Sequence, residues 1–162
     1  MKKILLFFCL SLIMVSCEIE SSKNGKLDGF WHLTTIDTIA TKGHLDVSEK
    51  GYFWSVQMHL LQIARQEGGT GLIVFRFENK DNTLRVYDPY ANHREDGDPK
   101  ITDTSITSLM GINQLDETFK IEKLTSSKMI LSSSTLKLYF RTLLKCLKYI
   151  VLLYHQYFPL QQ

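Results

Sequence analysis

Apolar and polar residues alternate in short runs along much of the chain between Gly29 and Arg141. A period of two places one side of a strand on a core and the other side in solvent. The longest run covers residues 52–61, and its apolar set is Tyr52, Trp54, Val56, Met58 and Leu60. Further strands are predicted at residues 30–36, 72–78, 119–122, 129–131 and 136–141, around Leu84 and Val86, and more weakly within 101–110. Many short strands with few helix signals predict an all-β sandwich or a small closed barrel.

Clusters of turn-forming residues separate these runs. Residues 79–82 predict the turn of a hairpin, and residues 68–71 read as another hairpin connection because a strand follows them. Residues 88–99 predict a loop, with a proline near each end and Gly97 inside it. Short turns are also expected at residues 125–127 and 132–134.

The pattern changes after Arg141, where apolar residues recur at helical spacing until Pro159. This set is Leu143, Leu147, Ile150, Val151, Tyr154 and Phe158. Residues 142–162 are therefore predicted to form an amphipathic helix of about four turns. Three roles stay open for this tail: packing on the outside of the barrel, lying on a membrane surface, or being a poorly selected extension, since the composition shifts abruptly there.

The N-terminus has the layout of a secretory signal. Lys2 and Lys3 precede an apolar run over residues 4–15, which is too short for a membrane span of around 20 residues. Ser16 and Cys17 follow, and this ending resembles the lipobox of bacterial lipoproteins. The resemblance implies that residues 1–16 are removed and that Cys17 carries a diacylglycerol and acyl chains such as palmitate. We then expect residues 17–27 to be a solvated tether and the protein to be held in the cell envelope, at the outer membrane, by its lipid.

Charge and cysteine content narrow the range of partners. The chain has 162 residues and a formal charge of +2, but loss of the two leader lysines leaves 17 basic and 17 acidic residues. The basic residues after Glu122 are spread out, which argues against a nucleic-acid partner. Cys9 leaves with the leader and Cys17 is predicted to be acylated, so Cys146 stands alone and no intramolecular disulfide or zinc knuckle is expected.

No pattern of catalytic or metal-binding residues stands out. The five histidines lack metal-ligand spacing, and the acidic residues of the 88–99 loop lack the order of a calcium-binding loop. Nucleophile-elbow, zinc-protease and phosphate-loop motifs are missing. We therefore expect neither an enzyme nor a bound metal or cofactor.

A Gly-x-Trp motif, Gly29 to Trp31, opens the first predicted strand, and Arg141 ends the last one. Both features resemble the lipocalins. The longer segments GYFWSVQMHLLQI, FRFENKDNTLRVYDPY and DETFKIEKLTSSKMILSSSTLKLYFR resemble the lipocalin-like domain of unknown function found in lipoproteins of gut Gram-negative anaerobes. The resemblance implies an antiparallel, up-and-down barrel of eight strands over residues 28–141. It also implies that Trp31 closes one end of the barrel under a stacked Arg141.

Two functions follow as hypotheses. In the first, the lipid-anchored barrel binds a small apolar or amphipathic ligand in a pocket lined by Trp54, Met58, Phe75, Phe77 and Tyr87. In the second, bulky inward side chains fill the barrel, and it acts as a non-catalytic accessory module that docks on an envelope protein through the acidic, aromatic loop at residues 87–99. An eight-stranded barrel has room for either its own side chains or one small ligand.

Overall fold

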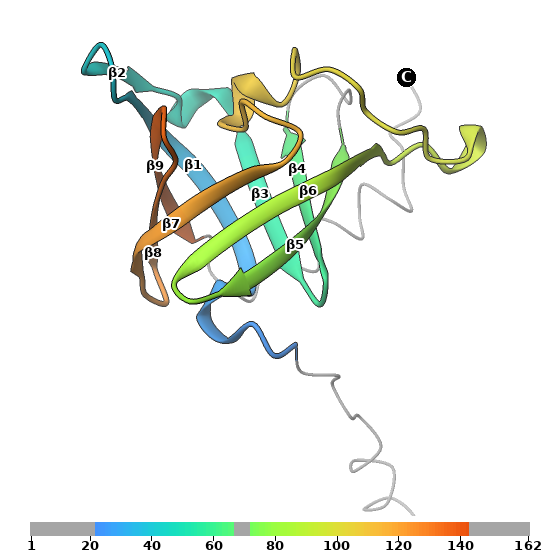
Figure 1. The fold of residues 1–162 in the computed structure, drawn as a ribbon, viewed down its shortest axis with the longest axis horizontal. Helices are drawn as coiled ribbons and strands as arrows, with labels where there is room; N and C mark the ends of the chain where they lie inside the picture. Colours follow the sequence, from blue (N-terminus) through green and yellow to red (C-terminus); the bar gives the residue numbers. More distant parts are fainter. Residues whose placement is uncertain (1–21, 67–71, 143–162) are drawn as a thin grey trace, which may run out of the picture.

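The computed structural model describes residues 22–66 and 72–142, and nearly all of their regular structure is β-strand (Figure 1). The strands are β1 (Gly29–Thr38), β2 (Gly43–Asp46), β3 (Tyr52–Gln57), β4 (Leu60–Arg65), β5 (Ile73–Lys80), β6 (Thr83–Ala91), β7 (Glu117–Leu124), β8 (Lys128–Ser132) and β9 (Leu136–Thr142). The short 3-10 helices are η1 (Gly25–Leu27), η2 (Ser48–Lys50), η3 (Arg94–Asp96) and η4 (Ser108–Met110). The described residues contain no α-helix, and none of their helices is long and apolar enough to cross a membrane.

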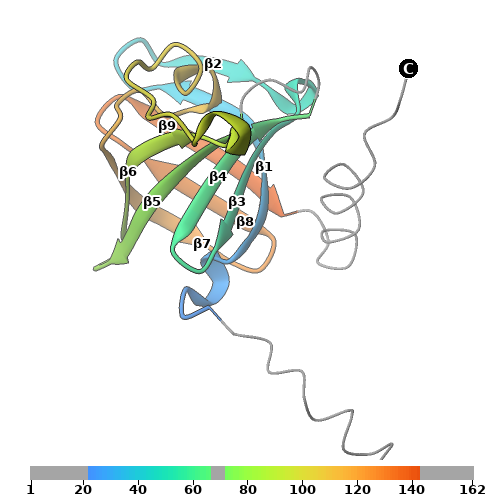
Figure 2. The same ribbon diagram turned by 90° about the vertical axis from the view of Figure 1, so that its right-hand side faces the viewer.

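A single antiparallel sheet closes on itself to form the barrel (Figures 1 and 2). Strand β1 pairs with β3, strands β3 to β9 pair in chain order, and β9 pairs with β1 to complete a ring of eight. Strand β2 stands outside the ring and pairs only with the second half of β1, from Thr35 to Thr38. The predicted up-and-down barrel of eight strands is confirmed, whereas β2 was not predicted because its four residues are all exposed and show no apolar alternation.

The run at residues 52–61 is two strands instead of one. A turn at Met58 and His59 separates β3 from β4, and Met58 adopts a positive φ of 53°. The turn reverses the inward face, so Leu61 and Ile63 are buried while Leu60 is 51% exposed. The prediction that Met58 and Leu60 continue the inward set of β3 is therefore wrong.

The segment from residue 101 to 116 covers one end of the barrel instead of forming the weak strand predicted there. Met110 and Ile112 are buried in the core, and the buried Thr107 hydroxyl donates a hydrogen bond to the carbonyl of Ile112 at 2.9 Å. Gly111 lies between them with a φ of +89°, which a residue with a Cβ rarely adopts. This closure depends on contacts with distant strands, so local alternation could not reveal it.

The opposite end of the barrel is covered by η1 (Figure 1). Leu27 is fully buried, and its carbonyl accepts a 2.8 Å hydrogen bond from Nε1 of Trp31. The last residues of the predicted tether at 17–27 are thus part of the folded barrel. Residues 1–16, Cys17 and the predicted C-terminal helix lie outside the described residues, except that Thr142 ends β9.

Candidate functional site

Aromatic side chains occupy the inside of the barrel. Trp54 is fully buried, and its ring centroid lies 5.8 Å from that of Phe119 and 5.0 Å from that of Phe140. Its indole Nε1 donates a 3.0 Å hydrogen bond to the carbonyl of Met110 in the covering segment. This bond satisfies the polar edge of a buried ring, so Trp54 acts as a packed core residue.

The five predicted pocket residues do not line one pocket. Trp54, Phe75 and Phe77 do come together inside the barrel, but they belong to its continuous hydrophobic core. Met58 lies in the β3–β4 turn and is 40% exposed. Tyr87 faces outward, because it pairs with the exposed Arg76 across β5 and β6. The prediction of an interior pocket is therefore corrected: Trp54, Phe75 and Phe77 pack in a filled core, and Met58 and Tyr87 lie outside this core.

A β-bulge in β6, where this strand pairs with β5, shapes the outer surface of the barrel. Val74 pairs with Tyr90 and Arg76 pairs with Tyr87, so Asp88 and Pro89 lie opposite Phe75 alone. Asp88 adopts a positive φ of 54°, which aspartate tolerates better than most residues. Since two residues on one strand face one on the other, Tyr87 and Tyr90 both point outward although they are three positions apart. The sequence signal for this bulge is the Asp88–Pro89 pair, at which the sequence predicts the start of a loop instead.

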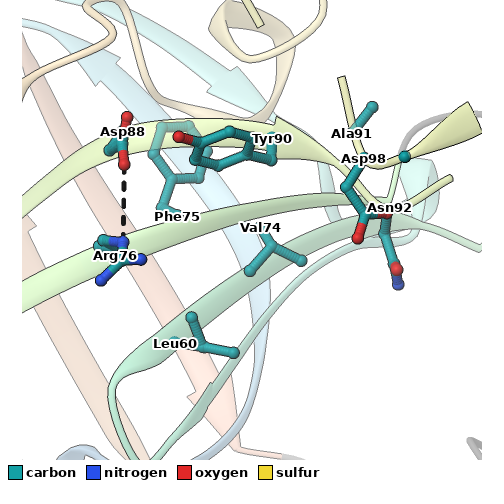
Figure 3. Close-up of a pocket in the computed structure, with 10 residues that line it drawn as sticks. Leu60, Val74, Phe75, Arg76, Asp88, Tyr90, Ala91, Asn92 and Asp98 are labelled. Carbon is teal, nitrogen blue, oxygen red and sulfur yellow. Dashed lines mark ion pairs between the residues drawn. The ribbon is translucent and has the colours of Figure 1, made fainter. Parts of the chain in front are cut away.

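A hollow of about 440 Å3 lies beside the bulge, on the outer surface of β4, β5 and β6 (Figure 3). Its lining is Leu60, Val74, Phe75, Arg76, Asp88, Tyr90, Ala91, Asn92, Gly97 and Asp98. Figure 3 shows the apolar side chains of Leu60 and Val74 and the ring of Tyr90 between two polar ends. The Arg76–Asp88 pair forms one end, while Asn92 and Asp98 form the other.

Asp88 holds the bulge together through two cations. Its carboxylate accepts a 2.6 Å hydrogen bond from Nζ of Lys100, and Nε of Arg76 lies 3.5 Å from its other oxygen. The Lys100 hydrogen bond is the main cause that lowers the pKa of Asp88, and the same bond raises the pKa of Lys100. Backbone hydrogen bonds from Ala91 to Pro99 and from Ile101 to Pro89 fasten the same segment to β6. At neutral pH the Asp88 carboxylate is therefore ionised, and the two cations bound to it neutralise its charge.

A second hollow of about 360 Å3 lies on the other side of Asp88. It is lined by Tyr87, Asp88, Pro89, Lys100, Ile101, Leu115 and Asp116. The guanidinium of Arg85 lies 4.7 Å from the ring centroid of Tyr87 and donates to both carboxylate oxygens of Asp116 at 2.9 and 2.7 Å. These bonds raise the pKa of Arg85 and lower that of Asp116. Each charged side chain that lines this second hollow, Asp88, Lys100 and Asp116, therefore has a partner of opposite charge.

The predicted stacking of Arg141 on Trp31 is not what the structure has. Trp31 points into the barrel and is 1% exposed, whereas Arg141 is exposed and pairs in register with the outward-facing His32. The two side chains lie on opposite faces of the sheet, and the cation–π contacts of the described residues involve Arg85, Lys100 and Lys137. Leu27 closes the barrel over Trp31 instead. Gly29 does begin β1, with a φ of +149° that favours glycine.

Metal-ligating residues do not converge within residues 22–66 and 72–142. No group of three or more histidine, cysteine, aspartate or glutamate side chains there could hold a metal ion. His44 forms a simple pair with Asp37 at 2.7 Å, and His93 lies 3.8 Å from Asp96.

The family model and one solved structure agree with this architecture. The family model of a lipocalin-like domain matches residues 12–143. The structure of a lipocalin-like protein from Bacteroides uniformis is similar with a TM-score of 0.56 and 20% identity, over 74% of this chain and 100% of that one. An uncharacterized protein from Bacteroides eggerthii matches with a TM-score of 0.49 and 18% identity, over 72% of this chain and 98% of that one. A search of curated proteins found no match.

Proposed function

The chain belongs to the lipocalin-like domain family, and from this premise we propose that it is a non-catalytic binding protein of the cell envelope. In this proposal it is anchored by a lipid on Cys17 and takes a small amphipathic ligand in the outer hollow beside Asp88. The observation that carries the proposal is the contrast between a core filled by Trp54, Phe119 and Phe140 and a hollow of about 440 Å3 on the outer surface. Small-molecule sites commonly have volumes of about 300–1,000 Å3.

The lining of the hollow suits an amphipathic ligand. Leu60 and Val74 offer apolar surface, and Leu60 is 51% exposed although it lies in a strand. Arg76, Asn92 and Asp98 offer charged or polar groups at the ends of this surface (Figure 3). Apolar surface contributes affinity and a few polar groups orient the ligand, which is the usual division in small-molecule sites.

The anchor would orient the barrel relative to the membrane. Leu27 covers one end of the barrel, while residues 101–116 cover the opposite end (Figure 1). The ten residue-to-residue steps from Cys17 to Leu27 can span at most about 35 Å. The proposed lipid therefore holds the η1 end toward the membrane and leaves the loop end facing away from it.

Ligand binding can be tested with the mature chain, residues 17–162, carrying Cys17→Ser so that no lipid competes. Titration with a neutral fluorescent probe that has an apolar aromatic body should give a saturable signal. Val74→Arg places a large side chain in the hollow and should abolish this signal. Thr118→Arg is the matched control, because Thr118 is exposed on β7 away from the lining, and it should bind as the parent does. Equal binding by both variants would place the ligand elsewhere and contradict the proposal.

A second candidate function is docking on an envelope protein, in which the barrel is an accessory module. The filled core favours this function, as do the exposed apolar side chains Leu60 and Leu72 near the same hollow. Crosslinking in intact cells, followed by mass spectrometry, distinguishes the two functions. A partner recovered at constant stoichiometry from the parent and lost from Val74→Arg would support docking.

A further inference from the structure

Charge is unevenly distributed around the outer hollow. Three of its lining side chains are charged, and two of them, Arg76 and Asp88, pair with each other at 3.5 Å. Asp88 also holds Lys100 at 2.6 Å, which lies outside the lining, so this end of the hollow has two cations around one carboxylate. Asp98 makes no side-chain hydrogen bond or ion pair with the rest of the described chain. One unneutralised carboxylate therefore faces the hollow.

The position of Asp98 is set by the backbone around it. Asp98 has a positive φ of 51° and follows Gly97, whose φ is +75°. The Asp98 amide donates a 3.1 Å hydrogen bond to the carbonyl of His93, and the carbonyl of Pro99 accepts one from Ala91 at 2.9 Å. These bonds fold the loop back onto the end of β6. As a result, the carboxylate lies at the end of the hollow opposite the Arg76–Asp88 pair (Figure 3).

The surroundings strengthen the negative charge at this end. Residues 92–99 contain the acids Glu95, Asp96 and Asp98 and a single arginine. Asn92, which also lines the hollow, adds an amide oxygen that can accept a hydrogen bond from an N–H group. An anionic ligand would meet a free carboxylate here, while a cationic one would find both a charge partner and an acceptor.

We infer that the hollow selects a small ligand with a primary or secondary ammonium group on a compact apolar body. The ammonium pairs with Asp98, and the body packs on Leu60, Val74 and the ring of Tyr90. This inference rests on the proposed function, because it names the ligand class of the same hollow. The volume of about 440 Å3 suits an aromatic or short aliphatic amine.

Three probes with nearly the same body test the charge preference: phenethylammonium, 2-phenylethanol and 3-phenylpropanoate. Each is titrated into the mature Cys17→Ser chain by calorimetry, with saturation-transfer NMR for weak binding. We expect the ammonium probe to bind about fivefold more tightly than the alcohol, as one exposed charge pair allows, and the carboxylate to bind most weakly. High salt should reduce this preference.

The variant Asp98→Asn keeps the shape of the side chain and removes its charge. It should abolish the preference for the ammonium probe and leave binding of the alcohol unchanged. Asp96→Asn is the matched control, because it removes the same charge from the same loop but lies outside the lining, and it should keep most of the preference.

The outcomes separate the inference from the proposed function. Equal binding of the three probes, lost in Val74→Arg, would uphold the hollow as a ligand site and overturn the charge selection. An unchanged preference in Asp98→Asn would also overturn it. Failure of all three probes to bind the parent would contradict the proposed function itself.

Discussion

His32 illustrates how a single side chain can be mismatched to its surroundings. It points outward from β1, and its ring stacks on that of Phe53 with 4.9 Å between centroids. The ring of Phe30 also stacks on that of Phe53, with 4.9 Å between centroids. The Nε2 atom of His32 is buried without a hydrogen-bond partner in the described part of the chain. An unsatisfied buried polar atom costs about 1–3 kcal/mol.

We therefore expect His32→Phe to stabilise the barrel. Phenylalanine keeps the stacking on Phe53 and removes the unsatisfied nitrogen, so the free energy of unfolding should rise by about 1 kcal/mol. Urea denaturation followed by far-UV circular dichroism measures the change. Phe53→Ala is the control that removes the stack and should destabilise the protein. A loss of stability in His32→Phe would mean that the nitrogen is hydrogen-bonded in solution.

At the scale of elements, turn chemistry decided which hairpins could be recognised. The β5–β6 turn contains Asp81 and Asn82, both with positive φ, as a tight turn of the primed type requires. Aspartate and asparagine favour this conformation, so the predicted hairpin is confirmed. Met58 takes the same kind of conformation in the β3–β4 turn. Methionine carries no such signal, and the alternation there continued without a visible break.

The segment at residues 101–116 offers a test of how one end of the barrel is closed. Gly111 has a φ of +89°, and a Cβ built there would lie 2.9 Å from a methyl carbon of Leu138 on β9. Leu138 is fully buried, so it has little room to move. We expect Gly111→Ala to lower the free energy of unfolding by about 2–4 kcal/mol, since backbone strain and overpacking add.

Gly97→Ala is the matched control for Gly111→Ala. Gly97 also has a positive φ, of +75°, but nothing lies within 4 Å of a Cβ built there. Its substitution should cost about 1 kcal/mol, from the backbone alone. Denaturant unfolding of the two variants measures the difference. Equal losses would show that Gly111 is needed for its conformation and that the closure tolerates a larger residue.

At the scale of the whole molecule, three short pairs between lysine or arginine and a carboxylate lie on the outer surface of the described residues, and their effect on stability depends on pH. Asp88 pairs with Lys100, Asp116 with Arg85, and Glu122 with Lys137, at 2.6, 2.7 and 2.6 Å. Hydrogen bonds from these cations lower the pKa of the three carboxyls below their ordinary values of 3.8, 3.8 and 4.5. Each carboxyl therefore contributes stability above its unfolded pKa and loses it as the pH falls through its folded pKa.

Acid should accordingly destabilise the barrel progressively below the ordinary carboxyl pKa values of 3.8 and 4.5. The effect should be modest and should weaken at high salt, because all three pairs are at the surface. Urea midpoints at neutral and acidic pH measure it. Asp116→Asn removes one of the linked carboxyls and should flatten the profile. A stability that is constant down to about pH 3 would contradict the linkage.

The proposed anchor makes a separate prediction for the whole chain in cells. Cys17→Ala should move the protein out of the membrane fraction, because each buried methylene of an acyl chain contributes about 0.8 kcal/mol to membrane binding. Cys146→Ala is the matched control and should stay with the membranes. Fractionation and immunoblotting of both variants measure the outcome. Equal retention of Cys17→Ala and the parent would show that something other than the lipid holds the protein.

Alternation of apolar and polar residues was enough to predict the all-β class, as a sandwich or a small closed barrel, because side chains of a strand alternate between faces whatever it pairs with. The choice of an eight-stranded barrel depended on the resemblance to the lipocalins. The turn residues after β5 could likewise be predicted, since their conformational preferences are local. Only the tertiary structure decided that Trp54 and Phe75 fill the interior and that Arg141 lies away from Trp31. The outer hollow also needed it, because a bulge at Asp88 shifts the register of β6 and the loop that follows β6 brings Asp98 into the same lining as Val74. Packing and register depend on residues far apart in the chain, and no local pattern records them.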